Sequence, residues 1–209
     1  MPSYKLRYFD IRGIGEVSRQ IFFLSGTPFG DERIQFEDWD RNSRIKKGTP
    51  FGTLPVLEID GEVIPTSCTI NRYLAKQFGF AGKSPFQGAL VDALADQFMD
   101  YFEEVKKFLL ISNGIWEGEV DEAIRQRAER GVANHFPLIE EFVKVHGSDG
   151  YCVGGSLTWV DLLLTDHFRS LIHYFPDVLS PFPVLTHVVE TIGSDPRLSE
   201  WRKEHESIF

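Results

Sequence analysis

The chain has little cysteine, no excess of positive charge and no long apolar run. Its 209 residues include two cysteines, Cys68 and Cys152, which are too few for a disulfide framework and are typical of a reduced cytoplasmic protein. Lys and Arg total 22 against 31 Asp and Glu, which argues against a general binder of nucleic acid or anionic membranes. No segment is apolar enough to span a bilayer or to act as a signal peptide. We therefore expect a cytoplasmic protein that binds neither nucleic acid nor membrane.

Several catalytic signatures are also missing. The six histidines are scattered without metal-ligand spacing, so we expect no metal. No Ser-His-Asp order stands out, and no Cys-x-x-Cys follows the first strand, which disfavours a thioredoxin-like redox role.

The pattern of apolar residues changes near residue 82. Before this point strand and helix signals alternate as β-α-β and then β-β-α; after it nearly all signals are helical. The predicted strands are 5–9, 33–36, 56–59 and 62–64, and the predicted helices are 15–26, 67–79, 86–112, 119–146, 158–174 and one from 195. We therefore expect an α/β plus all-α protein, with a thioredoxin-like domain at 1–80, a linker at 81–85 and an all-helical domain at 86–209.

Pro55 stands where an interior strand begins, although proline cannot donate a ladder hydrogen bond. This placement indicates a deliberate bend, with a cis peptide as one way to make it. Such a bend leaves the backbone of Leu54 outside the sheet, where its N–H and C=O can pair with a peptide-like ligand.

Thr66 and Ser67 follow the hairpin and begin a helix. Taken alone, Ser67 is best interpreted as an N-cap, whose hydroxyl satisfies a free backbone N–H. The N-terminus of a helix also attracts a carboxylate. With Leu54 nearby, these residues outline a site for a small acidic peptide.

Three further groups have both a structural and a functional interpretation. Tyr8 ends the first strand; strand tyrosines usually pack, but a phenol here would emerge beside the peptide site and donate to an anion. Asp96 and Asp100 share a helix face, which is either solvated or faces an ammonium group. A polar loop combines a tryptophan with three cationic side chains. It is either exposed to solvent or binds a carboxylate of the ligand; the residues are Trp39, Arg44, Lys46 and Lys47.

Five segments in order resemble the cytosolic glutathione transferases, most closely the sigma class and the related nematode-type, or nu-like, branch. They are 4–13 (YKLRYFDIRG), 15–22 (GEVSRQIF), 50–55 (PFGTLP), 94–101 (LADQFMDY) and 156–161 (SLTWVD). The resemblance covers essentially the whole chain and implies a homodimer with glutathione as co-substrate.

The resemblance also implies roles for individual residues. Tyr8 would hydrogen-bond the glutathione sulfur and favour its thiolate form. Trp39 with a lysine would bind the glycyl carboxylate, and Leu54 would pair with the cysteinyl backbone. The implied glutathione-binding set is Tyr8, Trp39, Lys46, Gly52, Thr53, Leu54, Thr66, Ser67 and, from the partner subunit, Asp100. Counting along the loop leaves Arg44 and Lys47 as alternatives to Lys46.

The resemblance places the second substrate in an apolar cleft, with candidate residues Phe9, Ile14, Met99 and Phe209. Three positions depart from the family pattern. Ile14 stands where sigma relatives often have arginine, Thr53 replaces a Gln or Lys, and Thr66 replaces a Gln. We expect a more apolar cleft and altered glutathione affinity.

The function implied is a glutathione transferase of the detoxification type, which conjugates the thiolate to apolar electrophiles. Two alternatives remain. One is a glutathione-dependent prostaglandin D isomerase, which the loss of arginine at position 14 disfavours. The other is a non-catalytic carrier of haem or other apolar ligands, which the presence of Tyr8 and Ser67 disfavours.

Overall fold

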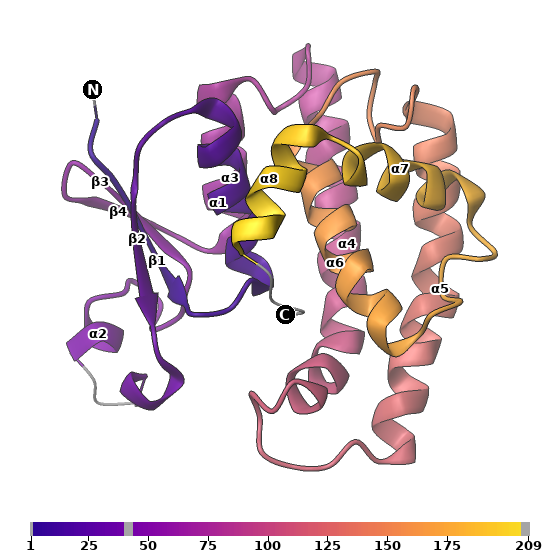
Figure 1. Ribbon diagram of the computed structural model, residues 1–209, viewed down its shortest axis with the longest axis horizontal. Helices are drawn as coiled ribbons and strands as arrows, with labels where there is room; N and C mark the ends of the chain where they lie inside the picture. The colour runs from indigo at the N-terminus through magenta and orange to yellow at the C-terminus, as the bar shows by residue number, and fades with distance from the viewer. Residues whose placement is uncertain (1, 40–43, 206–209) are drawn as a thin grey trace. The chain divides into compact units, whose positions relative to one another are not determined.

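The computed structural model describes residues 2–39 and 44–205. Its contacts divide the chain into two compact units (Figure 1). The first unit is Met1–Ala81 with Gly193–Phe209, and the second is Gly82–Ile192.

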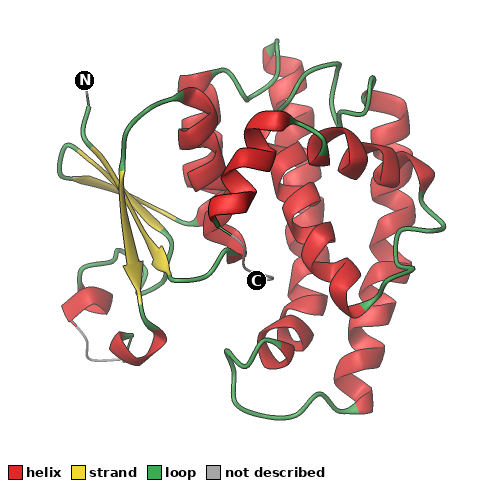
Figure 2. Cartoon of the chain, in the orientation of Figure 1, coloured by secondary structure: helices red, strands yellow, loops and turns green. Residues whose placement is uncertain are grey.

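The first unit contains a four-stranded mixed sheet in the order β2-β1-β3-β4 (Figure 2). The central strand β1 runs parallel to β2 and antiparallel to β3, and β3 forms a hairpin with β4. The strands are β1 Tyr4–Phe9, β2 Gly30–Ile34, β3 Val56–Ile59 and β4 Glu62–Pro65. Asp60 and Gly61 both adopt positive φ in the hairpin turn, as a tight turn between twisted strands requires.

Two helices cover one face of this sheet, α1 (Glu16–Ser25) and α3 (Ser67–Phe78) (Figure 1). Their apolar stripes meet the inward side chains of the central strands, and Leu6, Ile21, Leu57 and Ile70 are fully buried. Short 3-10 turns at Gly13–Gly15 (η1) and Phe36–Asp38 (η2), and the short helix α2 at Arg44–Lys47, complete the segment before β3.

Two local predictions for this unit are wrong. The second strand is Gly30–Ile34 instead of 33–36. It is an edge strand whose polar side chains face solvent and form cross-strand ion pairs, so apolar and polar residues do not alternate along it. Ser67 is the first helical residue of α3 and Thr66 is the N-cap, with no side-chain capping bond.

The last helix, α8 (Pro196–Glu204), packs on α1 and groups with the first unit. The ring of Trp201 lies 5.1 Å from that of Phe23 in α1. By contacts, residues 193–209 therefore belong with the α/β unit, whereas the sequence division assigned them to the helical domain. The division into domains at 1–80, 81–85 and 86–209 stays a prediction.

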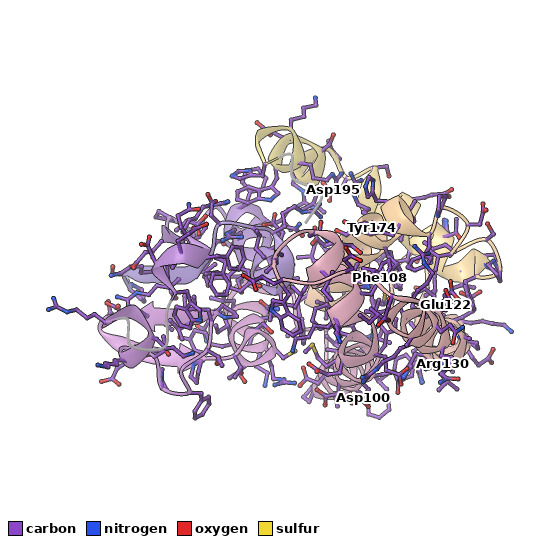
Figure 3. The ribbon with its side chains drawn as sticks, turned by 90° about the horizontal axis from the view of Figure 1, so that it is seen from below. Asp100, Phe108, Glu122, Arg130, Tyr174 and Asp195 are labelled. Carbon is purple, nitrogen blue, oxygen red and sulfur yellow. The ribbon has the colours of Figure 1, made fainter. Side chains whose placement is uncertain are left out.

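The second unit is helical. It contains α4 (Pro85–Ser112), α5 (Glu122–His146), α6 (Trp159–Tyr174) and α7 (Pro183–Gly193). Phe108 of α4 meets Tyr174 of α6 edge to face, with ring centroids 5.6 Å apart (Figure 3). A capping box begins α6, since Asp161 accepts from the Thr158 amide at 2.6 Å.

The expected fold class, a thioredoxin-like unit followed by helices, is confirmed. Helix α7 has no counterpart in the prediction, because prolines at 181 and 183 make this segment read as a loop. Within residues 2–39 and 44–205, no helix is both long and apolar enough to cross a membrane.

Candidate active site

The strand register places three of the predicted site residues in one row. Arg7 pairs with Val56, and Val56 pairs with Pro65. Continuing the β1–β3 pairing by one residue puts Tyr8 opposite Pro55. Continuing the β3–β4 pairing by one residue puts Thr66 opposite Pro55 on its other side. The Thr66 amide donates to the Pro55 carbonyl at 3.2 Å. The predicted meeting of strand end, bend and helix start is therefore present.

The bend before β3 has the predicted geometry. The Leu54–Pro55 peptide bond is cis, and β3 begins at Val56. No hydrogen bond joins the N–H or C=O of Leu54 to any residue in the described ranges. This backbone is half-buried and open to a peptide-like partner, as expected.

The start of α3 lies beside this bend. The first helical hydrogen bond runs from the Ile70 amide to the Thr66 carbonyl at 3.0 Å, so the amides of Ser67, Cys68 and Thr69 precede the helical ladder. Thr66 itself has φ 69° and ψ 135°, a conformation that costs a β-branched residue free energy and is concentrated at functional sites. The Ser67 hydroxyl makes no hydrogen bond to another described residue, which leaves it available to a ligand.

Tyr8 is held in a tight setting. Its side chain is 6% exposed, and its hydroxyl oxygen accepts a hydrogen bond from the backbone N–H of Ile14. A Cβ added at Gly13 would lie 2.6 Å from that oxygen, and one at Gly15 would collide with the ring. Burial raises the pKa of Tyr8 to about 12, against the opposing effects of the Ile14 N–H and the Arg19 charge. The phenol therefore keeps its proton at neutral pH and can donate it in a hydrogen bond.

Arg19 is a residue of this site that sequence analysis missed. It is fully buried, and its guanidinium carbon lies 5.7 Å from the centre of the Tyr8 ring. Helical periodicity gave no signal for it, because position 19 lies on the opposite side of α1 from Val17 and Ile21. In the structure every residue from Glu16 to Phe22 is buried.

A second cluster forms around Trp39, next to the bend. The ammonium of Lys46 lies 5.5 Å from the centre of the Trp39 ring, in the range of a cation–π contact. A Cβ on Gly52, which has φ 63°, would lie 3.6 Å from Lys46 Cε. The structure thus brings Lys46 beside Trp39 and Gly52, whereas Arg44 and Lys47 are exposed.

The remaining predicted residues are more dispersed. Thr53 is exposed beside Leu54, and Phe9 and Ile14 are half-buried in the first unit. Phe9 packs on Trp39 with ring centroids 5.6 Å apart. In the second unit, Met99 is half-buried and Asp100 is exposed on α4 (Figure 3). Phe209 lies outside the described residues.

The titratable side chains of this site do not form a metal centre. Within the described ranges, no group of three or more His, Cys, Asp or Glu residues is placed to hold a metal ion. The site instead consists of an open backbone pair, a helix start and a protonated phenol.

Comparisons with known proteins agree with this arrangement. Two family models match, "Glutathione S-transferase, N-terminal domain" at residues 21–77 and "Glutathione S-transferase, C-terminal domain" at 111–205. The chain is 43% identical over 204 residues to glutathione S-transferase 1 of Ascaris suum, covering 98% of this chain and 97% of the relative.

Solved structures are similar over the full length. A Nu-class glutathione S-transferase from Haemonchus contortus has a TM-score of 0.84 at 36% identity, with 100% of both chains covered. Na-GST-3 from Necator americanus, described as monomeric, has a TM-score of 0.89 at 37% identity, with 98% of both chains covered. Since full-length identity above 40% accompanies the bend, helix start and phenol that a glutathione site needs, the chain belongs to the glutathione S-transferase family and is a transferase with glutathione as its co-substrate.

Proposed function

We propose that Tyr8 activates glutathione by donating a hydrogen bond from its phenol to the sulfur. The observation that carries this proposal is the buried phenol, whose raised pKa keeps the proton on oxygen. A donor of this kind stabilises a thiolate without taking its proton. Because a free thiol has a pKa of about 8.5, a lowering by one or two units makes the thiolate abundant at neutral pH.

The rest of the first unit supports a single orientation for glutathione. The cysteinyl backbone pairs with the open N–H and C=O of Leu54. The γ-glutamyl carboxylate lies at the start of α3, near Thr66 and Ser67, where the helix dipole and the amides that precede the helical ladder favour an anion. The glycyl carboxylate binds Lys46 and the Trp39 indole, next to Gly52 and Thr53.

The second substrate in this proposal is an apolar electrophile, as in detoxification. Ile14 in place of arginine supports an apolar preference. The roles of Phe9, Met99 and Phe209 stay predictions from the family resemblance.

The decisive experiment compares the wild-type protein with Tyr8→Phe. Conjugation of glutathione to a chlorodinitrobenzene is followed, and glutathione affinity is measured by calorimetry. We expect kcat/KM to fall about ten- to a hundredfold, as for loss of a hydrogen bond to a charged group, with little change in affinity. Wild type that binds glutathione without conjugating it would favour the carrier alternative, and equal activity of Tyr8→Phe would refute the role of Tyr8. Turnover of a prostaglandin endoperoxide measures the isomerase alternative in the same preparation.

We also propose that the protein is a homodimer in which Asp100 of one subunit faces the γ-glutamyl amine at the other subunit's site. Phe51, at the tip of the loop before Leu54, is 68% exposed. In this proposal the partner subunit covers Phe51, and Asp100, which is exposed on α4, reaches the partner's site. Light scattering after gel filtration measures the mass, and a monomer, as described for Na-GST-3, would refute the proposal.

A mixing experiment tests the shared site directly. Asp100→Ala and Tyr8→Phe subunits are each impaired when pure. If Asp100 acts across the dimer, half of the subunits in a random mixture form mixed dimers with one intact site, so activity rises to about one quarter of wild type. If Asp100 acts within its own subunit, mixing produces no rise.

Within the family, we place the chain in the sigma class or its nematode-type branch, on the motifs around Tyr8 and the similarity to the Nu-class structure. A cytoplasmic location is proposed because the two cysteines, Cys68 and Cys152, do not form a disulfide.

A further inference from the structure

A buried arginine lies directly behind the segment that follows Tyr8. Arg19 Nη1 donates to the Ile11 carbonyl at 2.7 Å, and Nη2 donates to the Phe9 carbonyl at 3.2 Å. Since Phe9 immediately follows Tyr8, these bonds hold the backbone that carries the phenol. The same guanidinium lies 5.7 Å from the centre of the Tyr8 ring, so its charge also acts on whatever binds the hydroxyl.

Arg19 is shared with two carboxylates. Its Nε lies 3.2 Å from both carboxylate oxygens of Asp31 in β2. Its Nη1 lies 3.4 Å from Glu16 Oε2. Glu16 is only 2% exposed and Arg19 is fully buried, so water does not screen the interaction between their charges. The electrostatic effect of each group on its surroundings therefore depends on its hydrogen-bonding partners.

The shorter hydrogen bond of Glu16 comes from the far end of the chain. Trp201 Nε1 donates to Glu16 Oε1 at 2.6 Å. The indole is held in α8, because its ring stacks on His205 at 3.7 Å and packs on Phe23 at 5.1 Å. All members of this network belong to the first unit.

This geometry makes Arg19 respond to Trp201 and Glu16. If the indole N–H is removed, Glu16 loses its shortest described hydrogen bond, and its buried charge attracts Arg19 more strongly. Arg19 then moves away from the Phe9 and Ile11 carbonyls. If the Glu16 charge is removed instead, the Arg19 charge is less neutralised and acts more strongly on the Tyr8 hydroxyl and its ligand.

We propose that Trp201 and Glu16 are positioning residues for Tyr8, acting through Arg19 to set the acidity of the bound glutathione thiol. The inference rests on the proposed role of Tyr8. The other charged groups packed around Arg19 are Asp31 and Asp10, the latter paired with Arg33 at 3.2 Å; these charges are the same in all variants below.

The test measures the pKa of bound glutathione from the ultraviolet absorbance of its thiolate across pH. Trp201→Phe removes the N–H and keeps an aromatic ring, and we expect the thiol pKa to rise by about one unit, which is a tenfold fall in thiolate at pH values below the pKa. Glu16→Gln removes the charge and keeps the shape, and we expect the thiol pKa to fall. Phe23→Leu is the matched control: it loosens the packing of the indole but keeps its N–H, and the thiol pKa should match wild type.

The two main variants shift the pKa in opposite directions, which a general loss of packing does not do. Glutathione affinity, measured by calorimetry at a pH below the pKa of the bound thiol, should change less than threefold in both, because the thiol is then protonated and neither residue contacts the peptide. A shift in the same direction for Trp201→Phe, Glu16→Gln and Phe23→Leu, or no shift in the first two, would overturn the inference. If Trp201→Phe does not fold, the sign of the Glu16→Gln shift decides. Tyr8→Phe in the same assay separates the two proposals, since an unchanged thiol pKa there refutes the role of Tyr8 itself.

Discussion

The amide of Thr66 donates a hydrogen bond to the carbonyl of Pro55 across 3.2 Å. This bond joins the last residue before α3 to the bend before β3, and so places the open backbone of Leu54 beside the start of the helix. The same bond holds Thr66 at φ 69°. The local backbone free energy of Thr66 is therefore unfavourable in the folded state, and the surrounding sheet and helix compensate for it.

Replacing Thr66 separates this strain from the role of its hydroxyl. Thr66→Gly and Thr66→Ala both remove the hydroxyl, but only glycine adopts positive φ without a steric cost. We expect the glycine variant to be about 1 kcal/mol more stable than the alanine variant in urea unfolding. Both should lose glutathione affinity to the same extent if the hydroxyl contacts the ligand. Equal stability of the two variants would show that the backbone at position 66 is not strained.

Gly15 should be required for the position of Tyr8 and not for the backbone of α1. Its φ is −85°, which any residue adopts, but a Cβ there collides with the Tyr8 ring. We expect Gly15→Ala to lower kcat/KM for conjugation more than tenfold by displacing the phenol. Gly26→Ala is the control, because Gly26 has φ 66° with no atom within 4 Å of an added Cβ. That variant should lose about 1 kcal/mol of stability and keep full activity per folded molecule. Full activity in Gly15→Ala would contradict the tight packing described for Tyr8.

The row of Tyr8, Pro55 and Thr66 could be predicted because it depends on local signals. Three sequence signals lie within about a dozen residues: a proline before an apolar strand, an Asp-Gly turn and the start of a helix. The second strand was misplaced because an edge strand carries charged side chains, and Arg7 pairs with Glu32 at 3.0 Å across it. A period of two in apolar residues cannot reveal such a strand.

The network behind Tyr8 could not be predicted. Glu16 and Trp201 are 185 residues apart, and no periodicity links the start of α1 to the last helix. Periodicity places position 19 opposite the apolar stripe of α1, and its burial, like its carbonyl and carboxylate partners, depends on how α1, β2 and α8 pack.

Lys46 should contribute more to glutathione binding than its neighbour. Lys46 lies 5.5 Å from the centre of the Trp39 ring, whereas Lys47 is exposed. We expect Lys46→Gln to weaken glutathione binding about tenfold, the typical effect of losing one charge-assisted hydrogen bond, and Lys47→Gln to change it less than twofold. Calorimetry with glutathione and with a glycyl ester of glutathione tests the assignment. The ester should bind wild type about as weakly as glutathione binds Lys46→Gln, and equal effects of the two lysine variants would leave the glycyl carboxylate with a different partner.

His167 should make the helical unit sensitive to acid. Its ring nitrogen Nε2 lies 2.9 Å from the Tyr101 hydroxyl in the core, and burial lowers the pKa of His167 to about 3 from the usual 6.5. The unfolded chain takes up a proton near pH 6.5 whereas the folded chain does not, so this contribution to stability is complete above pH 6.5 and is lost as pH falls toward 3.

Unfolding in urea between pH 7 and pH 4 measures this loss. Below about pH 5.5 the His167 contribution should decrease by about 1.4 kcal/mol per pH unit. His167→Gln should remove that part of the slope even if its stability at pH 7 is lower, because glutamine does not titrate. His187→Gln, at an exposed position of α7, should keep the wild-type slope. An unchanged slope in His167→Gln would mean that the imidazole is already protonated in the folded core, and that the Tyr101 hydroxyl accepts a hydrogen bond from a charged ring.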